Sequence, residues 1–328
     1  MSCLPVIAIF DIGKTNKKFF LLDYNYQIKL EKSITLPEII DEDGDACEDV
    51  DALTNWITET FTHILKEKEY EIKAINFSAY GASFVHVDSS GKIVAPLYNY
   101  LKKYPVSLQD IFFKKYGGEE NLSCETASPI LGSLNSGLQL YRLMVEKPAV
   151  FRNIKYALHL PQYISYLITG KMFSDITSIG CHTLLWDFPR NKYHHWVKDE
   201  GIEIKLAPIS PSDKTFNITF DNKSMKAGTG LHDSSAALIP YLAVFKEPFL
   251  LISTGTWCIS LNPFNKTPLT NDELKNDCLC YLDYFGTPVK ASRLFAGYLH
   301  EQQIKRLAKH FEKKEDFYKS ISYDAAVI

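Results

Sequence analysis

Two short stretches far apart in the chain share one pattern, and this pattern constrains the fold more than any other feature. In residues 8–15 and again in residues 250–257, an apolar run leads into a small or acidic residue, a spacer, a glycine and a threonine, and a second apolar run follows. Repeats this far apart indicate two related lobes and not a stack of small repeats. A match this short also arises by chance, so the pattern alone leaves duplication and coincidence open.

The composition predicts a folded protein with a large core and excludes several kinds of partner. Apolar residues make up 46% of the 328 positions and aromatic residues 13%, which allows one long domain or two ordinary ones and argues against disorder. The formal charge is only -3, so no charge excess points to nucleic acid or to an anionic membrane. No apolar run approaches the roughly 20 residues that span a bilayer.

The amino terminus and the cysteines point to the cytoplasm. The residues before Asp11 lack a basic leader and a small-residue cleavage site, and they are typical of a first strand. The seven cysteines are scattered from Cys3 to Cys280 and form no disulfide framework. We therefore expect a soluble, reduced, cytoplasmic protein. The sequence does not set the oligomeric state, for which a homodimer is one option.

Alternating strand and helix patterns predict an α/β fold. We expect a hairpin around Gly13, a helix capped by Asp49 or Asp51, and a second hairpin around Gly91. The expected strands are 6–10, 19–22, 28–36, 72–77, 85–88 and 93–95, and further expected helices are 136–146, 161–169 and 301–319. Strand and helix patterns alternate again from residue 216 onward.

The first glycine turn carries residue types that suit a phosphate and a metal ion. Gly13 lets the backbone turn tightly, so that amide N–H groups and the Thr15 hydroxyl can face a phosphate. Asp11 beside it can hold Mg²⁺ through water, and Lys17 or Lys18 can add positive charge. An ordinary hairpin turn would explain the same residues. The P-loop pattern of nucleotide-binding proteins is excluded, because an alanine stands where its first glycine belongs.

A second candidate site follows the glycine-containing loop at 228–230. Asp233 stands at the start of a helix of small residues, where it is either the N-cap or a general base for an attacking hydroxyl group. His232 beside it can hydrogen-bond the same substrate. Asp233 lies between the two glycine turns in the sequence, so a cleft between two lobes would bring all three together.

These residues fall in an ordered set that resembles the FGGY carbohydrate kinases of the actin-like ATPase superfamily. The resemblance rests on residues 11–18, 78–88, 230–237 and 253–257, whose order and spacing match the family over nearly the whole chain. It implies two ribonuclease H-like lobes, 1–243 and 244–328, with a sugar and a nucleotide between them. It also implies ATP-dependent phosphorylation of a sugar or polyol hydroxyl group.

The resemblance further implies a role for each candidate residue. Asp233 would be the catalytic base, and Asp11 would hold Mg²⁺ through water. The ATP phosphates would bind Gly13, Thr15, Asn16, Lys18, Thr254, Gly255 and Thr256, and the sugar would bind Gly81, Ala82 and His232. The segment 175–186 would pack between the lobes near the sugar.

The sugar loop favours one branch of this family. Gly81 and Ala82 stand where xylulokinases tend to carry Met-His, and the Arg-Glu pair of glycerol kinases is absent from the sequence. The second glycine turn, which ends at Trp257, is also similar to that of rhamnulokinases and fuculokinases. The implied substrate is therefore a deoxy-ketohexose such as L-rhamnulose or L-fuculose.

Two departures from the family pattern stand out. Lys14 replaces a threonine of the first turn, where it would either strengthen phosphate binding or point into solvent. The Gly-Gly-Gly-x-x-Asn loop that holds adenosine in the family is absent from the sequence. We therefore expect an incomplete second lobe and, from this chain alone, weak ATP binding and little activity. The alternative is a non-catalytic actin-like sugar-binding or regulatory protein, which Asp233→Asn would separate from a kinase.

Overall fold

The computed structural model describes all residues except 1–2, 221, 255–257, 295, 323 and 327–328. The strands are β1 (Leu4–Ile12), β2 (Lys17–Leu22), β3 (Ile28–Ile34), β4 (Glu38–Ile40), β5 (Ala46–Glu48), β6 (Tyr70–Ala79), β7 (Phe84–Val87), β8 (Tyr156–His159), β9 (Ser174–Asp175), β10 (Trp186–Asp187), β11 (Lys192–Tyr193), β12 (Ile209–Ser210), β13 (Thr215–Phe220), β14 (Lys223–Gly228), β15 (Leu231–His232), β16 (Leu251–Thr254), β17 (Cys258–Asn262), β18 (Cys278–Leu282) and β19 (Pro288–Leu294). The helices are α1 (Val50–Lys66), α2 (Val106–Lys115), α3 (Glu119–Glu125), α4 (Ser136–Glu146), α5 (Pro148–Asn153), α6 (Leu160–Thr169), α7 (Ile176–Ile179), α8 (His195–Asp199), α9 (Asp233–Val244), α10 (Asn271–Lys275) and α11 (Ala296–His310).

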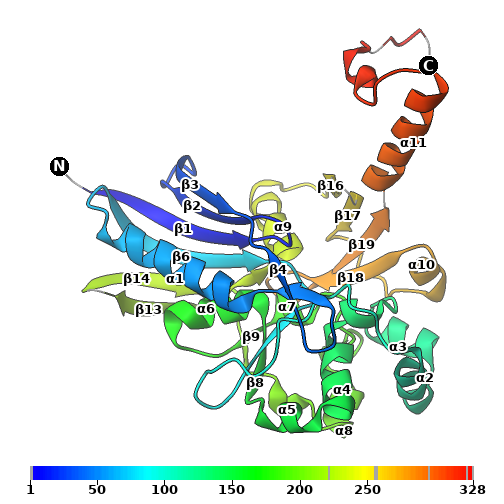
Figure 1. The fold of residues 1–328 in the computed structure, drawn as a ribbon, viewed down its shortest axis with the longest axis horizontal. Coiled ribbons are helices and arrows are strands. Elements are labelled where there is room, and N and C mark those ends of the chain that lie inside the picture. The colour runs from blue at the N-terminus through cyan, green and yellow to red at the C-terminus, as the bar shows by residue number, and fades with distance from the viewer. Residues whose placement is uncertain (1–2, 221, 255–257, 295, 323, 327–328) are drawn as a thin grey trace.

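Each lobe is built around a sheet, so the predicted α/β class is confirmed. The larger sheet has the order β13-β14-β6-β1-β2-β3, and β15 also pairs with β6. The smaller sheet is antiparallel, with the order β16-β17-β19-β18, and lies beyond the carboxyl ends of β1 and β6 (Figure 1). Both stretches of the repeated sequence pattern contribute to antiparallel hairpins, β1–β2 and β16–β17.

The predicted first hairpin and first helix are confirmed. β1 and β2 pair around the turn at Gly13, with Asp11 opposite Lys18. The carboxylate of Asp49 accepts a hydrogen bond from the N–H of Ala52, so Asp49 is the N-cap of α1. The apolar residues of α1 recur every three or four positions, and this stripe packs with β1, β6 and α6 in the main core.

Two expected elements differ from the structure. Residues 93–95 form no strand: β7 pairs with β8 instead, and only an isolated bridge joins Val87 to Ile93. The helix expected at 301–319 begins earlier and ends at His310, because the chain turns at Glu312 with a φ of 51°. A separate helical turn follows at Phe317–Ser320.

For its length, the second lobe exposes more large apolar side chains than the first. Ile252 is 53% exposed, whereas Phe10, which holds the same place in the repeated pattern, is fully buried. α11 projects away from the rest of the molecule (Figure 1), and the side chains of Leu307 on this helix and of Phe311 directly after it are also exposed. The first lobe therefore has a filled core, while the hairpin and helix of the second lobe keep open apolar faces.

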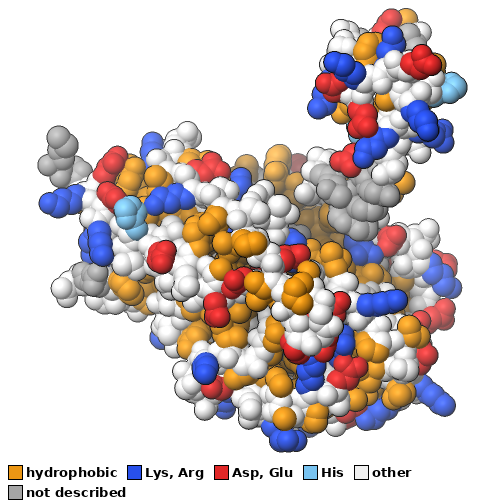
Figure 2. All heavy atoms as spheres, in the orientation of Figure 1, with side chains coloured by type: hydrophobic (Ala, Val, Ile, Leu, Met, Phe, Trp, Pro, Cys, Tyr) orange, Lys and Arg blue, Asp and Glu red, His pale blue; other side chains and the backbone are white. Residues whose placement is uncertain are grey.

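Acidic and basic side chains are interspersed on the face of the molecule shown in Figure 2. Among the described residues, no helix combines the length and the apolar character that a membrane span requires.

Candidate active site

Three parallel strands end at the same edge of the larger sheet and bring the candidate residues together. The register of β1, β6 and β15 places Asp11 beside Ser78, and Ser78 beside Leu231. Asp233 follows directly after β15 as the first residue of α9. Ligands of open α/β sheets bind outside the carboxyl ends of the strands, so this edge is where a site is expected.

A cavity of about 650 Å³ opens at this edge, and residues of both lobes line it. Its polar and glycine lining consists of Asp11, Gly13 and Ser78 from the first sheet, Asp233 and Ser234 from α9, and Ser253 from β16. Side chains alternate between the two faces of a strand, and Phe10 and Ile12 are buried in the core, so the carboxylate of Asp11 is left on the face of the cleft. The structure thus brings Asp233 and both hairpins to one cavity.

The carboxyl group of Asp11 is partly buried in this cleft. Burial raises its pKa, and the negative charge of Asp233 raises it further. The Ser78 hydroxyl and the positive charge of Lys18 act in the opposite direction. The net shift of the pKa is upward, chiefly because of burial, and the repulsion between the two carboxylates adds to it.

The side chain of Asp233 is partly exposed to the cleft and does not serve as the N-cap of α9. The N-cap is His232, and Asp233 Oδ1 accepts a hydrogen bond from the N–H of Ser234 at 2.6 Å. Burial raises the pKa of Asp233 to about 6, although this hydrogen bond opposes the shift. A carboxylate with such a pKa is mostly ionised at neutral pH and is a much better proton acceptor than an ordinary aspartate.

The first glycine turn is tight, as expected. The N–H of Gly13 donates to the carbonyl oxygen of Asn16 at 2.9 Å, and a Cβ at position 13 would lie 3.0 Å from that oxygen. Thr15 and Asn16 are exposed. Lys18 pairs with Glu31 at 3.4 Å while its charge also acts on Asp11.

The second glycine turn is described only in part. Thr254 is the exposed last residue of β16 and pairs with Cys258 across the hairpin. Gly255 and Thr256, which the sequence also assigns to the phosphates, lie outside the described residues.

The ammonium group of Lys14 does not stand free in solvent, because two glutamates hold it. Its ammonium group pairs with Glu38 at 2.8 Å and with Glu48 at 3.3 Å, and it lies 5.8 Å from the centre of the Tyr100 ring. Burial lowers the pKa of Lys14, but the two glutamates outweigh this effect and raise it. Lys17 is fully buried and donates to Glu48 and to the carbonyl oxygen of Lys14, so it adds no charge to the phosphate turn.

Gly81 is enclosed by side chains from two distant segments. A Cβ at this position would lie 2.8 Å from Cys181 Sγ and 3.0 Å from the His232 ring. Cys181 Sγ lies 3.0 Å from His232 Nε2, which in turn lies 3.1 Å from Asp233 Oδ1. Burial lowers the pKa of His232 to about 3, so the ring is neutral at physiological pH. A direct chain of contacts therefore links Gly81 to Asp233.

Two non-glycine residues beside this chain adopt left-handed backbone conformations. Ala82 has a φ of 61° and His182 a φ of 40°. Such conformations cost of order 1–3 kcal/mol each and cluster at functional sites. Gln139 holds the first of them, because its Nε2 donates to the carbonyl oxygen of Ala82 at 2.7 Å, and Asn135 holds the second by donating to the carbonyl oxygen of His182 at 2.7 Å.

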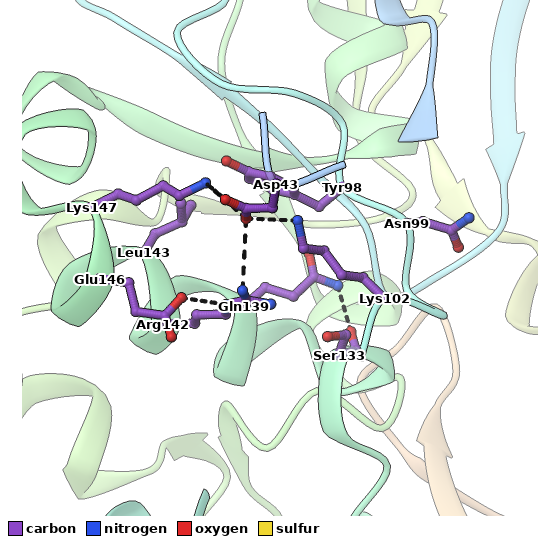
Figure 3. Close-up of a pocket in the computed structure, with 10 residues that line it drawn as sticks. All are labelled: Asp43, Tyr98, Asn99, Lys102, Ser133, Gln139, Arg142, Leu143, Glu146 and Lys147. Carbon is purple, nitrogen blue, oxygen red and sulfur yellow. Dashed lines mark hydrogen bonds and ion pairs between the residues drawn. The ribbon is translucent and has the colours of Figure 1, made fainter. Parts of the chain in front are cut away.

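Gln139 also lines a small pocket of charged side chains, shown in Figure 3. Lys102, Lys147 and Arg142 converge there on Asp43, at 2.8, 2.9 and 3.7 Å. Lys102 is nearly fully buried and also pairs with Asp41 and Asp45. These pairs fasten the acidic turn between β4 and β5 to α4.

Sequence reasoning missed Cys181, Gln139 and Asn135. Cys181 and Asn135 lie in segments where the sequence indicates packing or a helix start, and Gln139 is one polar residue in an otherwise apolar helix stripe. The glutamine within this apolar stripe was the signal that the sequence offered. A polar side chain on the buried face of a helix needs a hydrogen-bond partner, which predicts a specific contact there.

The fold and the site define a two-lobed α/β protein with a cleft between its lobes. Residues 6–238 match the N-terminal domain of the FGGY family of carbohydrate kinases, and residues 246–325 match the carbohydrate kinase FGGY C-terminal domain. The chain therefore belongs to the FGGY family of carbohydrate kinases, and the predicted resemblance is confirmed.

Individual relatives agree with this assignment. A rhamnulokinase of Halalkalibacterium halodurans is 26% identical over 262 residues, which cover 76% of this chain and 54% of that protein. A carbohydrate kinase from Novosphingobium aromaticivorans has a TM-score of 0.82 at 25% identity, over 92% of this chain and 66% of its own. A ligand-bound xylulose kinase from Lactobacillus acidophilus has a TM-score of 0.78 at 18% identity, over 95% and 64%. The chain thus spans about half the length of the rhamnulokinase and less than two thirds of these two structures.

Proposed function

We propose that this protein is an ATP-dependent kinase that phosphorylates a hydroxyl group of a ketose sugar. One observation carries the proposal: the carboxylate of Asp233, with its pKa raised to about 6, lines the same cavity as Asp11 and Gly13. Phosphoryl transfer requires a base for the attacking hydroxyl and a place for the phosphates, held in one cleft. Membership of a family of carbohydrate kinases supports the same assignment.

In the proposed reaction, Asp233 accepts the proton of the sugar hydroxyl. The hydroxyl oxygen forms a bond to the γ-phosphorus of ATP, the bond from that phosphorus to the β–γ bridging oxygen breaks, and ADP leaves. The product is a sugar phosphate, and the proton on Asp233 passes to water. Because the pKa of Asp233 lies close to neutral, the carboxylate is mostly ionised before the reaction and holds the proton well during it.

The residues around Asp11 fit a magnesium ion. Mg²⁺ prefers oxygen ligands, keeps several waters, and is bound by one or two carboxylates together with substrate phosphates. The negative charge shared by Asp11 and Asp233 would be relieved by a divalent cation. Among the described residues, no group of three or more His, Cys, Asp or Glu side chains is placed to hold a metal ion. When bound, the ion would neutralise charge on the transferred phosphoryl group.

For the phosphates we propose the turn Gly13–Lys18 on one side, through Gly13, Thr15, Asn16 and Lys18, and Thr254, Gly255 and Thr256 on the other. For the sugar we propose Gly81, Ala82 and His232. The position of His232 supports this, because its Nε2 atom lies 3.1 Å from Oδ1 of Asp233, the proposed base.

A deoxy-ketohexose such as L-rhamnulose or L-fuculose is the proposed substrate. Cys181 and the His232 ring occupy the space that a side chain at Gly81 would need, so a loop with Met-His at these two positions would not fit here. The match to a rhamnulokinase supports the same branch. Residues 1–243 and 244–328 are the proposed lobes.

The experiment that tests the proposal is a screen of ketoses with the wild-type protein, Mg²⁺ and ATP at high concentration, because this chain alone is expected to bind ATP weakly and to turn over slowly. ADP release is followed in a coupled assay, and the sugar phosphate is identified by mass spectrometry. We expect the highest kcat/KM for a 6-deoxy-ketohexose. ATP consumption without a sugar phosphate, or no consumption with any ketose, would contradict the proposal.

A further inference from the structure

Asp175, the last residue of β9, is a carboxylate buried without a cation. It is fully buried, and no basic side chain of the described part of the chain forms an ion pair with it. Its partners are neutral: it accepts hydrogen bonds from the N–H and hydroxyl of Thr177, from the Ser212 hydroxyl at 2.6 Å, and from the Thr229 hydroxyl at 3.5 Å. Burying a charge is costly unless hydrogen bonds compensate, so a carboxylate in this place needs an explanation.

Thr177 connects this carboxylate to the residues of the cleft. Its hydroxyl donates to Asp175 Oδ1 and accepts a hydrogen bond from the backbone N–H of His232 at 3.0 Å. Because its proton is committed to Asp175, the Thr177 oxygen is held with a lone pair towards that N–H. His232 is followed directly by Asp233, so this hydrogen bond sets the backbone from which the candidate base projects.

The loop before His232 is held from two further sides. Ser165 and Gln162 of α6 donate to the carbonyl oxygens of Gly228 and Gly230, at 2.7 and 2.8 Å. A Cβ at Gly230 would lie 2.4 Å from the carbonyl oxygen of Pro161, so α6 packs directly on this backbone. Asp175 accepts a hydrogen bond from the hydroxyl of Thr229, the residue between the two glycines. The segment 228–232 is therefore held along its length, and Asp175 contacts it directly at Thr229 and reaches His232 through Thr177.

We propose that Asp175 is a positioning residue for Asp233, acting through Thr177 and the backbone of His232. The proposal rests on the proposed kinase function, in which Asp233 is the base. The carboxylate orients the hydroxyl groups of Thr177 and Thr229, which hold the backbone that leads into α9. It is proposed to contact neither the sugar nor the nucleotide. Placing a base to well under an ångström matters because a displacement of about 1 Å can cost about 100-fold in rate.

The test compares Thr177→Val, Thr177→Ser and Asp175→Asn with the wild-type chain. The matched control is Thr126→Val, which removes an equally buried threonine hydroxyl that donates to the carbonyl oxygen of Leu122, away from the cleft. Amide hydrogen exchange of the 230–235 segment is measured first and needs no turnover. We expect exchange about tenfold faster in Thr177→Val and in Asp175→Asn, and unchanged in Thr177→Ser and in the control.

Turnover is measured second, with the ketose that the screen identifies. We expect kcat to fall about 10- to 100-fold in Thr177→Val with KM for the sugar changed by less than about threefold, and Thr177→Ser to restore it. Should Thr177→Val not fold, Asp175→Asn carries the same comparison.

Unchanged exchange in the 230–235 segment, or equal losses of kcat in the Thr126→Val control, would overturn the positioning role. A wild-type protein that phosphorylates no ketose would instead refute the proposed function, and the exchange comparison would still decide whether Asp175 and Thr177 order this backbone.

Discussion

Asp233 lies close enough to Asp11 for its negative charge to add to the effect of burial and raise the pKa of the Asp11 carboxyl group. The two residues come from elements far apart in the sequence, β1 and the start of α9, and they meet only because β1, β6 and β15 end side by side. In the proposed site, Asp233 accepts the proton of the substrate and Asp11 binds the cation.

The pKa of Asp233 predicts how the rate depends on pH. Its folded-state pKa of about 6 is raised by burial, and only the ionised form accepts a proton. We therefore expect kcat/KM to be nearly constant above about pH 7 and to fall about tenfold per pH unit below about pH 6. A pH–rate profile in the coupled assay checks this. A flat profile between about pH 5 and pH 7 would show that Asp233 is not the group that titrates.

The tight enclosure of Gly81 predicts a clash that a second substitution relieves. In Gly81→Ala the new Cβ would lie 2.8 Å from Cys181 Sγ and 3.0 Å from the His232 ring, so both must move. We expect sugar affinity to fall by about tenfold, because overpacking of this kind costs about 1–3 kcal/mol. Cys181→Ala in the same chain should recover most of that loss, as measured by calorimetry. Additive effects of the two substitutions would contradict the contact.

The ion pairs of Lys14 predict a structural and not a catalytic role. Its ammonium group is held by Glu38 and Glu48. Lys14→Thr should lower the free energy of unfolding by only about 0.5 kcal/mol, since the pair is partly exposed. Nucleotide affinity, measured by calorimetry, should change by less than about threefold. A loss of nucleotide affinity much larger than this would place Lys14 at the phosphates after all.

The basic side chains that surround Asp43 (Figure 3) predict a pH-dependent contribution to the free energy of unfolding. Hydrogen bonds from Lys102 and Lys147 lower the pKa of Asp43 from 3.8 to about 2. A lowered pKa stabilises the folded state above the ordinary pKa, and this stabilisation is lost as the pH falls from about 4 to about 2. Lys102→Met should therefore cost about 3 kcal/mol at neutral pH, because it also leaves the buried Asp41 without its cation. Urea unfolding at several pH values should show the deficit shrinking towards pH 2, and a deficit independent of pH would contradict this account.

Local patterns in the sequence predict much of the first lobe. The β1–β2 hairpin, the Asp49 cap and the helix Ser136–Glu146 follow from apolar spacing and turn residues alone, and each is confirmed. The resemblance of the ordered motifs to the FGGY carbohydrate kinases also predicts one cleft for Asp11 and Asp233, and both residues line the same cavity.

Contacts between distant segments could not be predicted in this way. β7 pairs with β8 and not with the nearby residues 93–95. Strand pairing depends on tertiary packing, which local sequence patterns do not contain. The same holds for the contact of Gly81 with Cys181 and for the ion pair of Lys14 with Glu48. Each joins two distant segments, and periodic patterns in the sequence report only on local structure.

The central claim is that Asp233 is the base, and Asp233→Asn tests it most directly. Asparagine keeps the size of the side chain but cannot accept the proton. Asp51→Asn is the matched control, because Asp51 is likewise an acid in the first turn of a helix but lies on exposed surface of α1.

The decisive measurement is the single-turnover rate of phosphoryl transfer to the ketose, alongside sugar affinity by calorimetry. We predict a rate at least about 1000-fold lower in Asp233→Asn, with sugar affinity within about threefold of wild type and with Asp51→Asn unchanged. Phosphoryl transfer at the wild-type rate in Asp233→Asn would contradict the account.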